Sequence, residues 1–175
     1  MKIAVASDLH LEFDDIALTN TENADVLVLA GDICTVKHYH SRPEMEKSYS
    51  EFFKACSEQF PHVVYVVGNH EHYNYQFNYT VNDLKRKLAH YENIHVLDNE
   101  TFELENKMFI GSTLWTDMNN ECPLTMNAAA FGMPDFRIIK YFDGIEYYRY
   151  TPQQSVIEHR RSLDYIKHVI RNSNE

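Results

Sequence analysis

Residues 62–71 read HVVYVVGNHE, an apolar run that ends in a cluster of polar residues. The run His62–Val67 is rich in valine and hardly alternates with polar residues, which is typical of a strand buried on both faces of an α/β sheet. Two earlier runs, Lys2–Ser7 and Asp25–Ala30, have the same character. The sequence therefore predicts three buried strands within the first 70 residues.

Helical patterns connect and follow these strands. Apolar residues recur every three to four positions over Glu44–Phe60, and a strand–helix–strand order implies parallel pairing. A second helix is expected over Thr80–His90 and a third from Pro152 to about Arg171, after an N-cap at Thr151. Residues 113–150 have no clear period and are expected to be irregular. Further short strands are predicted at Ile94–Leu97, Thr101–Glu105 and Lys107–Gly111. We expect residues 1–175 to form a single α/β domain.

Polar side chains stand at the end of each of the three buried strands. They are Asp8-Leu9-His10, Gly31-Asp32 and Gly68-Asn69-His70-Glu71. Because the carboxyl ends of parallel strands meet at one edge of a sheet, these clusters should converge. Each cluster alone is also an ordinary turn sequence, but their joint occurrence, in this order, favours a site. Carboxylate, imidazole and amide oxygen together suit a divalent cation such as manganese, iron or zinc.

These three clusters resemble the motifs of the calcineurin-like metallophosphoesterases: Asp-x-His, then Gly-Asp, then Gly-Asn-His-[Asp/Glu]. The resemblance is strong over residues 1–72 and looser beyond. It implies a fold of two packed mixed β-sheets flanked by helices. It also implies hydrolysis of phosphate mono- or diesters by a metal-activated water, with up to two divalent metal ions as cofactors.

The resemblance also implies roles for individual residues. Asp8, His10 and Asp32 are expected to hold one metal ion, with Asp32 bridging to a second ion bound by Asn69. His70 is expected to be the catalytic general acid. Glu71 is expected to orient His70 or a metal-bound water without binding the metal itself. A solvated carboxylate without such a role is an equal alternative. Arg137 is a candidate contact for a substrate phosphate, and a surface ion pair is the alternative.

The sequence departs from the family pattern in its second half. A later His at a strand end and a Gly-His-x-His motif are absent from the 175 residues. We therefore expect a fold that is C-terminally incomplete relative to the family, as a fragment or a natural truncation, with a poorly supported second metal site. An uncovered strand edge or apolar face is expected to follow, and with it self-association, most simply as a two-fold dimer.

Composition limits the cellular setting and the partners. Sixteen Lys and Arg against 26 Asp and Glu give a net charge of −10, which argues against a nucleic-acid surface and leaves small phosphoesters as the expected substrates. Three cysteines without a CxxC pair indicate a reducing compartment. No apolar stretch approaches the length of a membrane span. The expected location is cytoplasmic.

Two other function classes remain open on the sequence. A catalytically inactive pseudoenzyme or binding module could retain the first half of the fold without a competent metal centre. A nucleotide-binding α/β protein is the weaker alternative, because neither a P-loop nor a Gly-x-Gly-x-x-Gly motif occurs.

Overall fold

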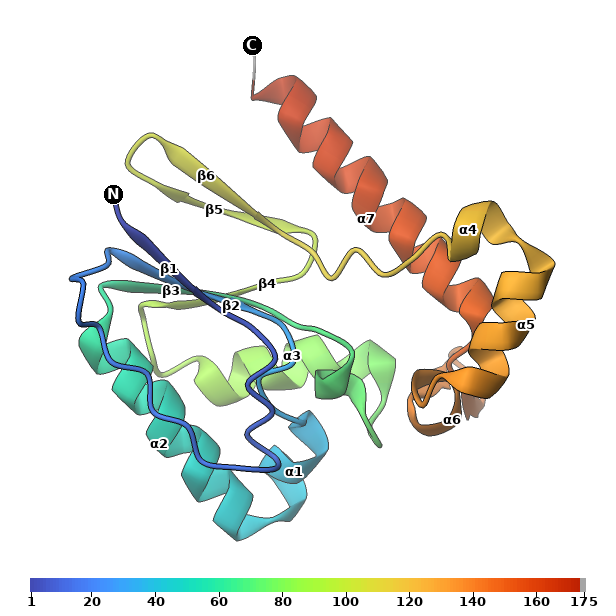
Figure 1. The fold of residues 1–175 in the computed structure, drawn as a ribbon, viewed down its shortest axis with the longest axis horizontal. Helices are drawn as coiled ribbons and strands as arrows, with labels where there is room; N and C mark the ends of the chain where they lie inside the picture. The colour runs from blue at the N-terminus through green and yellow to red at the C-terminus, as the bar shows by residue number, and fades with distance from the viewer. Residues whose placement is uncertain (174–175) are drawn as a thin grey trace.

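Figure 1 shows the computed structural model, which describes residues 1–173 of the chain. Its largest sheet is four-stranded and parallel, in the order β1-β2-β3-β4. The strands are β1 (Ile3–Ala6), β2 (Val26–Ala30), β3 (His62–Val66) and β4 (Ile94–Leu97). The register pairs Ala6 with Leu29 and Leu29 with Tyr65, so the three polar clusters lie at one edge of the sheet. The predicted α/β class and parallel order are confirmed.

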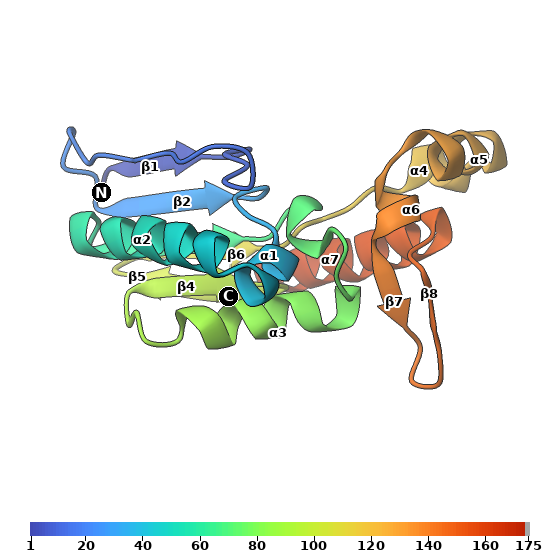
Figure 2. The ribbon, with the colours of Figure 1, turned by 90° about the horizontal axis from the view of Figure 1, so that it is seen from below.

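Helices pack against one face of this sheet (Figures 1 and 2). They are α1 (Val36–Ser41), α2 (Pro43–Gln59) and α3 (Phe77–Leu88), with a 3₁₀ turn η1 (His70–His72) between β3 and α3. The core between the helices and the sheet includes Leu29, Phe53 and Tyr65, all fully buried. The predicted helix at Glu44–Phe60 is confirmed within a residue of each bound. The helix expected at Thr80–His90 begins earlier, at Phe77.

An antiparallel hairpin covers part of the opposite face of the sheet. Its strands are β5 (Glu100–Leu104) and β6 (Lys107–Gly111), and Phe102 and Phe109 pack against Val64 and Leu97. Among the described residues the large sheet is parallel and the second sheet has two strands, rather than the two mixed sheets that the resemblance implied.

The expected burial of all three strands on both faces is wrong for β1. Its Ile3 and Val5 are 49% and 68% exposed, because the β5–β6 hairpin packs over β2, β3 and β4 instead. An uncovered apolar face is thus present at β1. Self-association through such a face stays a prediction.

The segment expected to be irregular contains short helices and a second hairpin. They are α4 (Met118–Glu121), α5 (Pro123–Gly132), α6 (Asp135–Ile138), β7 (Lys140–Phe142) and β8 (Tyr147–Arg149). The prediction was wrong because elements of three to four residues are too short to develop a period, and α5 buries no residue at all. A separate core of Phe136, Ile139 and Tyr150 holds this segment against Phe77 and Trp115.

The last helix, α7 (Pro152–Asn172), begins as predicted. Thr151 accepts a hydrogen bond from the backbone N–H of Gln154, and the Gln154 side chain accepts one from the backbone N–H of Thr151. No helix within residues 1–173 combines the length and apolar character that a membrane crossing requires.

Candidate metal centre

The loops that follow β1 and β2 run side by side beyond the ends of the strands. The backbone N–H of Asp8 donates to Gly31 O, and that of His10 donates to Asp32 O, both at 3.0 Å. Asp8, His10 and Asp32 all have positive φ, at 54°, 48° and 55°. This left-handed backbone costs a non-glycine residue about 1–3 kcal/mol and is concentrated at functional sites. Ten other non-glycine residues of the described chain share a positive φ, so this backbone accompanies the candidate ligands without identifying the site by itself.

The glycines before the clusters allow the loops to approach each other. A Cβ on Gly68 would clash with Oδ1 of Asp32 and would lie 2.7 Å from its backbone nitrogen. Gly31 has φ +88°, and a Cβ there would lie 3.0 Å from the backbone of Gly68. Both positions need glycine for the Asp32 carboxylate to lie against the loop after β3.

Three of the predicted site residues form a compact donor cluster. His10, Asp32 and His70 each offer one ligand atom, and these atoms lie within 4.8 Å of one another. Asp32 is also fixed by its neighbour, because Oδ1 accepts the backbone N–H of His70 at 2.9 Å. Two imidazoles and a carboxylate are a donor set for borderline divalent cations.

Another predicted ligand, Asp8, lies outside this cluster. Asp8 is exposed, and its Oδ2 accepts a hydrogen bond from Ser7 Oγ. The amide nitrogen of Asn69 donates to the Tyr73 hydroxyl at 3.0 Å. The cluster therefore contains His70 where the resemblance implied Asp8.

Glu12 is a site residue that the sequence reasoning missed. Its side chain is 5% exposed, and Oε1 lies 2.8 Å from Nδ1 of His70 and 3.5 Å from Nδ1 of His10. The other oxygen, Oε2, is buried without a hydrogen-bond partner among residues 1–173. Its position two residues after His10, in Asp-x-His-x-Glu, is the only signal in the sequence.

Glu71 is fully buried and braces the backbone of the site. Its carboxylate accepts hydrogen bonds from Tyr65 Oη at 2.6 Å and from the backbone N–H groups of Gly68, Ile33 and Asp32 at 2.7, 2.8 and 3.2 Å. The alternative of a solvated carboxylate is wrong, because the side chain fills the space between the loops after β2 and β3. Burial raises the pKa of Glu71, although the Tyr65 hydroxyl opposes the shift. Glu12, and not Glu71, contacts the ring of His70.

Tyr73 connects this edge of the sheet to α6. The ring of Tyr73 stacks on His70 at a centroid distance of 4.1 Å, and its hydroxyl lies 3.4 Å from Oδ2 of Asp135. Asp135 is buried, and its Oδ1 has no hydrogen-bond partner in the described chain. Arg137, on the same short helix, is exposed, and no contact joins it to the cluster within residues 1–173. The α6 side chain that is linked to Tyr73 is thus Asp135, and not Arg137.

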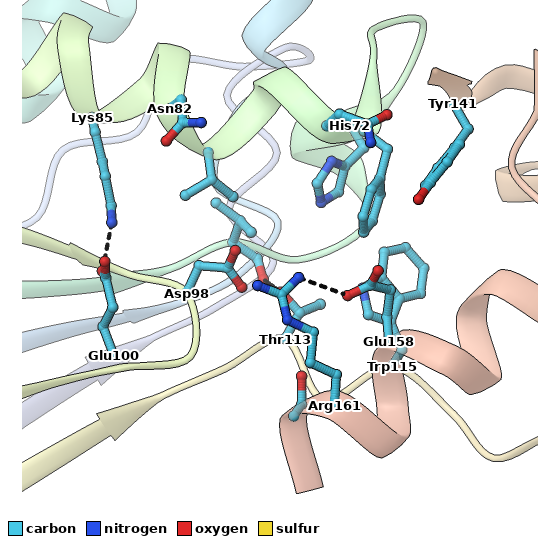
Figure 3. Close-up of a pocket in the computed structure, with 15 residues that line it drawn as sticks. His72, Asn82, Lys85, Asp98, Glu100, Thr113, Trp115, Tyr141, Glu158 and Arg161 are labelled. Atoms are coloured by element: carbon cyan, nitrogen blue, oxygen red, sulfur yellow. Dashed lines mark hydrogen bonds and ion pairs between the residues drawn. The ribbon is translucent and has the colours of Figure 1, made fainter. Parts of the chain in front are cut away.

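A cavity of about 370 Å³ lies on the other side of η1. Its walls come from α3, α7 and the segments around Asp98 and Trp115 (Figure 3). His72 lines it and stacks on Phe77 at 4.6 Å, so His70 and His72 face different surroundings. Burial lowers the pKa of His72 to about 3, which keeps this imidazole neutral at pH 7.

The charges in this cavity are largely compensated by one another. Nη1 of Arg161 lies 3.5 Å from Oε2 of Glu158, and Nζ of Lys85 lies 2.5 Å from Oε2 of Glu100. Burial raises the pKa of Glu158 and of Asp98, and Arg161 opposes both shifts. Figure 3 shows the guanidinium between these two carboxylates. Three carboxylates against two cations leave this cavity with an excess of one negative charge.

Comparisons with known proteins agree with the fold. A family model described as calcineurin-like phosphoesterase matches residues 1–166. An uncharacterized protein of Acanthamoeba polyphaga mimivirus is 32% identical over 184 residues, which covers 95% of this chain and 62% of the viral protein. The crystal structure of a phosphopantetheinyl hydrolase from Mycobacterium tuberculosis is similar in fold, with a TM-score of 0.59 and 15% identity. That match covers 95% of this chain and 62% of the hydrolase, so the chain spans less than two thirds of both proteins.

Proposed function

This chain belongs to the calcineurin-like phosphoesterase family, and from that premise we propose that it hydrolyses phosphate mono- or diesters with the help of divalent metal ions. The observation that carries the proposal is the convergence of His10, Asp32 and His70, with one nitrogen or oxygen atom of each within 4.8 Å of the others. We assign His10 and Asp32 to the metal and His70 to the leaving group.

The donors suit the metal that the family implies. His10 and Asp32 are the proposed ligands of the first cation, and Asp8 and the amide oxygen of Asn69 are the remaining candidates. Nδ1 of His10 is buried without a hydrogen-bond partner among residues 1–173, and it lies 3.5 Å from Oε1 of Glu12. The other ring nitrogen is therefore the proposed ligand atom. When bound, divalent cations act as Lewis acids on the phosphoryl oxygens and on the attacking water.

A residue of the chain supplies the proton that the leaving group needs. Hydrolysis adds water to phosphorus and breaks the bond to the alcohol oxygen, which then needs a proton. Nδ1–H of His70 donates to Glu12, so Nε2 is the ring nitrogen left for substrate. In the proposed mechanism the protonated ring gives its Nε2 proton to that oxygen, as a general acid.

Hydrolysis of 4-nitrophenyl phosphate and bis(4-nitrophenyl) phosphate tests the proposal. Activity is expected with Mn²⁺ and is expected to be lost in EDTA. Asp32→Asn and His70→Ala should each lower kcat by about 100-fold or more. Asp164→Asn, an exposed aspartate on α7, is the matched control. Equal activity of wild type and Asp32→Asn would overturn the proposal.

Calorimetry separates this function from that of an inactive binding module. Wild type should bind Mn²⁺ more tightly than millimolar, and Asp32→Asn should bind it more weakly. A folded protein with neither hydrolysis nor measurable metal binding would favour the inactive alternative.

A further inference from the structure

The β7–β8 hairpin presents two cations and two aromatic rings on one face. Lys140 pairs with Arg149, and Phe142 pairs with Tyr147, across the antiparallel strands. Residues directly opposite in such a pair point to the same side, and so do residues two apart on one strand. The two positive charges therefore lie next to each other, beside the Phe142 and Tyr147 rings, which stack at 4.7 Å.

The hairpin is fixed to the segment that carries the candidate metal centre. The backbone N–H of Lys140 donates to Tyr75 O at 3.0 Å, and that of Phe142 donates to Oδ1 of Asn78 at 2.9 Å. Tyr75 and Asn78 follow η1, which begins at His70. Figure 2 shows the hairpin projecting from the rest of the chain at this end. The hairpin is thus held against the segment that follows η1.

The two cations form no ion pair within the described part of the chain. Both Lys140 and Arg149 are exposed, and within residues 1–173 neither has an ion-pair partner, although the chain carries a net charge of −10. Asp143, in the turn of the hairpin, accepts hydrogen bonds from the backbone of Ile145 and Glu146 and is occupied there. Like charges directly opposite in a sheet repel, so an anion bound between them would relieve the repulsion.

A shallow cavity of about 380 Å³ lies beside the hairpin, at the end that carries the two cations. It is lined by Gln76, Lys140, Tyr147, Tyr148 and Arg149. Tyr147 is 56% exposed, so its ring offers a free surface beside the cations. An exposed aromatic ring next to two positive charges is the combination that holds a nucleotide, through base stacking and contacts to the phosphate.

We propose that this cavity binds a nucleoside phosphate, with Lys140 and Arg149 at a phosphate and Tyr147 against the base. The inference rests on the proposed function and deepens it. The substrate class becomes esters that carry a nucleotide unit whose phosphate is distinct from the one that is hydrolysed. The net charge of −10 argues against a nucleic acid as the ligand, but one nucleotide needs only this local pair of cations.

Binding of AMP in EDTA tests the inference without metal or turnover. Calorimetry should give saturable binding to wild type, weakened about 10-fold or more in Lys140→Gln/Arg149→Gln, since charge-assisted contacts to phosphate are lost. The control Lys107→Gln/Lys167→Gln removes two exposed cations elsewhere and should bind AMP as wild type does. Tyr147→Leu should weaken the binding of AMP but leave the binding of inorganic phosphate unchanged.

Amide chemical shifts of the wild-type protein provide a readout that does not depend on any variant folding. AMP should shift residues of β7 and β8. Shifts confined to other segments, or AMP binding unchanged in the double variant, would overturn the inference. So would inorganic phosphate or an acidic peptide binding as tightly as AMP. None of these results bears on hydrolysis of 4-nitrophenyl phosphate, so the proposed function and this inference fail separately.

Discussion

Oε1 of Glu12 lies 2.8 Å from Nδ1 of His70, although the two residues are 58 positions apart in the chain. The same oxygen is 3.5 Å from Nδ1 of His10. A carboxylate that faces Nδ1 of an imidazole holds the proton there and leaves Nε2 for the metal or the substrate. One nearly buried glutamate therefore orients the imidazole of His70 and lies beside that of His10.

Glu12→Gln is expected to lower kcat by about 10- to 100-fold with little change in KM, because a neutral amide holds the His70 ring less firmly. Hydrolysis of 4-nitrophenyl phosphate gives the kinetic measurement. Nitrogen NMR of the metal-free protein gives the tautomer of His70, which should shift from Nδ1–H toward a mixture. Glu103→Gln, at an exposed position on β5, is the control. A variant with unchanged tautomer and unchanged kcat would remove Glu12 from the site.

Tyr73→Phe is expected to weaken Mn²⁺ binding by about tenfold, since the phenol that accepts from the Asn69 amide at 3.0 Å is lost. Burial raises the pKa of Tyr73 to about 12, so the hydroxyl is neutral at pH 7 and serves only as a hydrogen-bonding group. Calorimetry with Tyr165→Phe as the control checks the effect. If Asn69→Ala weakened Mn²⁺ binding and Tyr73→Phe did not, the Tyr73 hydroxyl would have no role in positioning Asn69.

The ends of the strands could be predicted from the sequence because parallel pairing fixes where they meet. Asp32 and His70 are 38 residues apart, yet each follows an apolar run, and the sheet brings them to a 2.9 Å hydrogen bond. Glu12 could not be predicted in the same way. It lies in a loop, and its contact with His70 depends on the path of that loop beyond the end of β1.

The contact between Tyr73 and Asp135 could not be predicted from the sequence either. It joins η1 to a four-residue helix inside a segment that has no detectable period, so neither the helix nor its direction could be inferred. The β7–β8 hairpin could not be predicted for the same reason, because strands of three residues are too short to show an alternation of apolar and polar residues.

Gly68→Ala is expected to destabilise the fold by about 1–3 kcal/mol and to abolish tight metal binding, because the new Cβ would push against the backbone nitrogen of Asp32 at 2.7 Å. The urea midpoint gives the stability, and calorimetry gives the metal affinity. Gly132→Ala is the matched control, since a Cβ there meets no atom within 4 Å. Equal effects of the two substitutions would show that the approach of Asp32 to Gly68 is not tight.

The last prediction concerns the pH dependence of the β5–β6 hairpin. His95 on β4 stacks on Phe102 of β5 at 3.8 Å, and His62 on β3 lies 6.0 Å away. Nε2 of His95 is buried without a hydrogen-bond partner in the described part of the chain. Burial lowers the pKa of His95 from 6.5, and the charge of His62 lowers it further. The hairpin therefore packs on a neutral imidazole.

The lowered pKa means that the unfolded chain binds more protons than the folded one between the native pKa and 6.5. The free energy of unfolding should consequently rise with pH in that window. The contribution of His95 is present above pH 6.5 and is lost as the pH falls through the native pKa. Urea unfolding between about pH 5 and pH 8 should show a shallower pH dependence in His95→Gln than in wild type. His90→Gln, at an exposed position after α3, should keep the wild-type dependence. If His95→Gln kept it as well, protonation of His95 would not oppose folding, and the hairpin would not depend on a neutral ring.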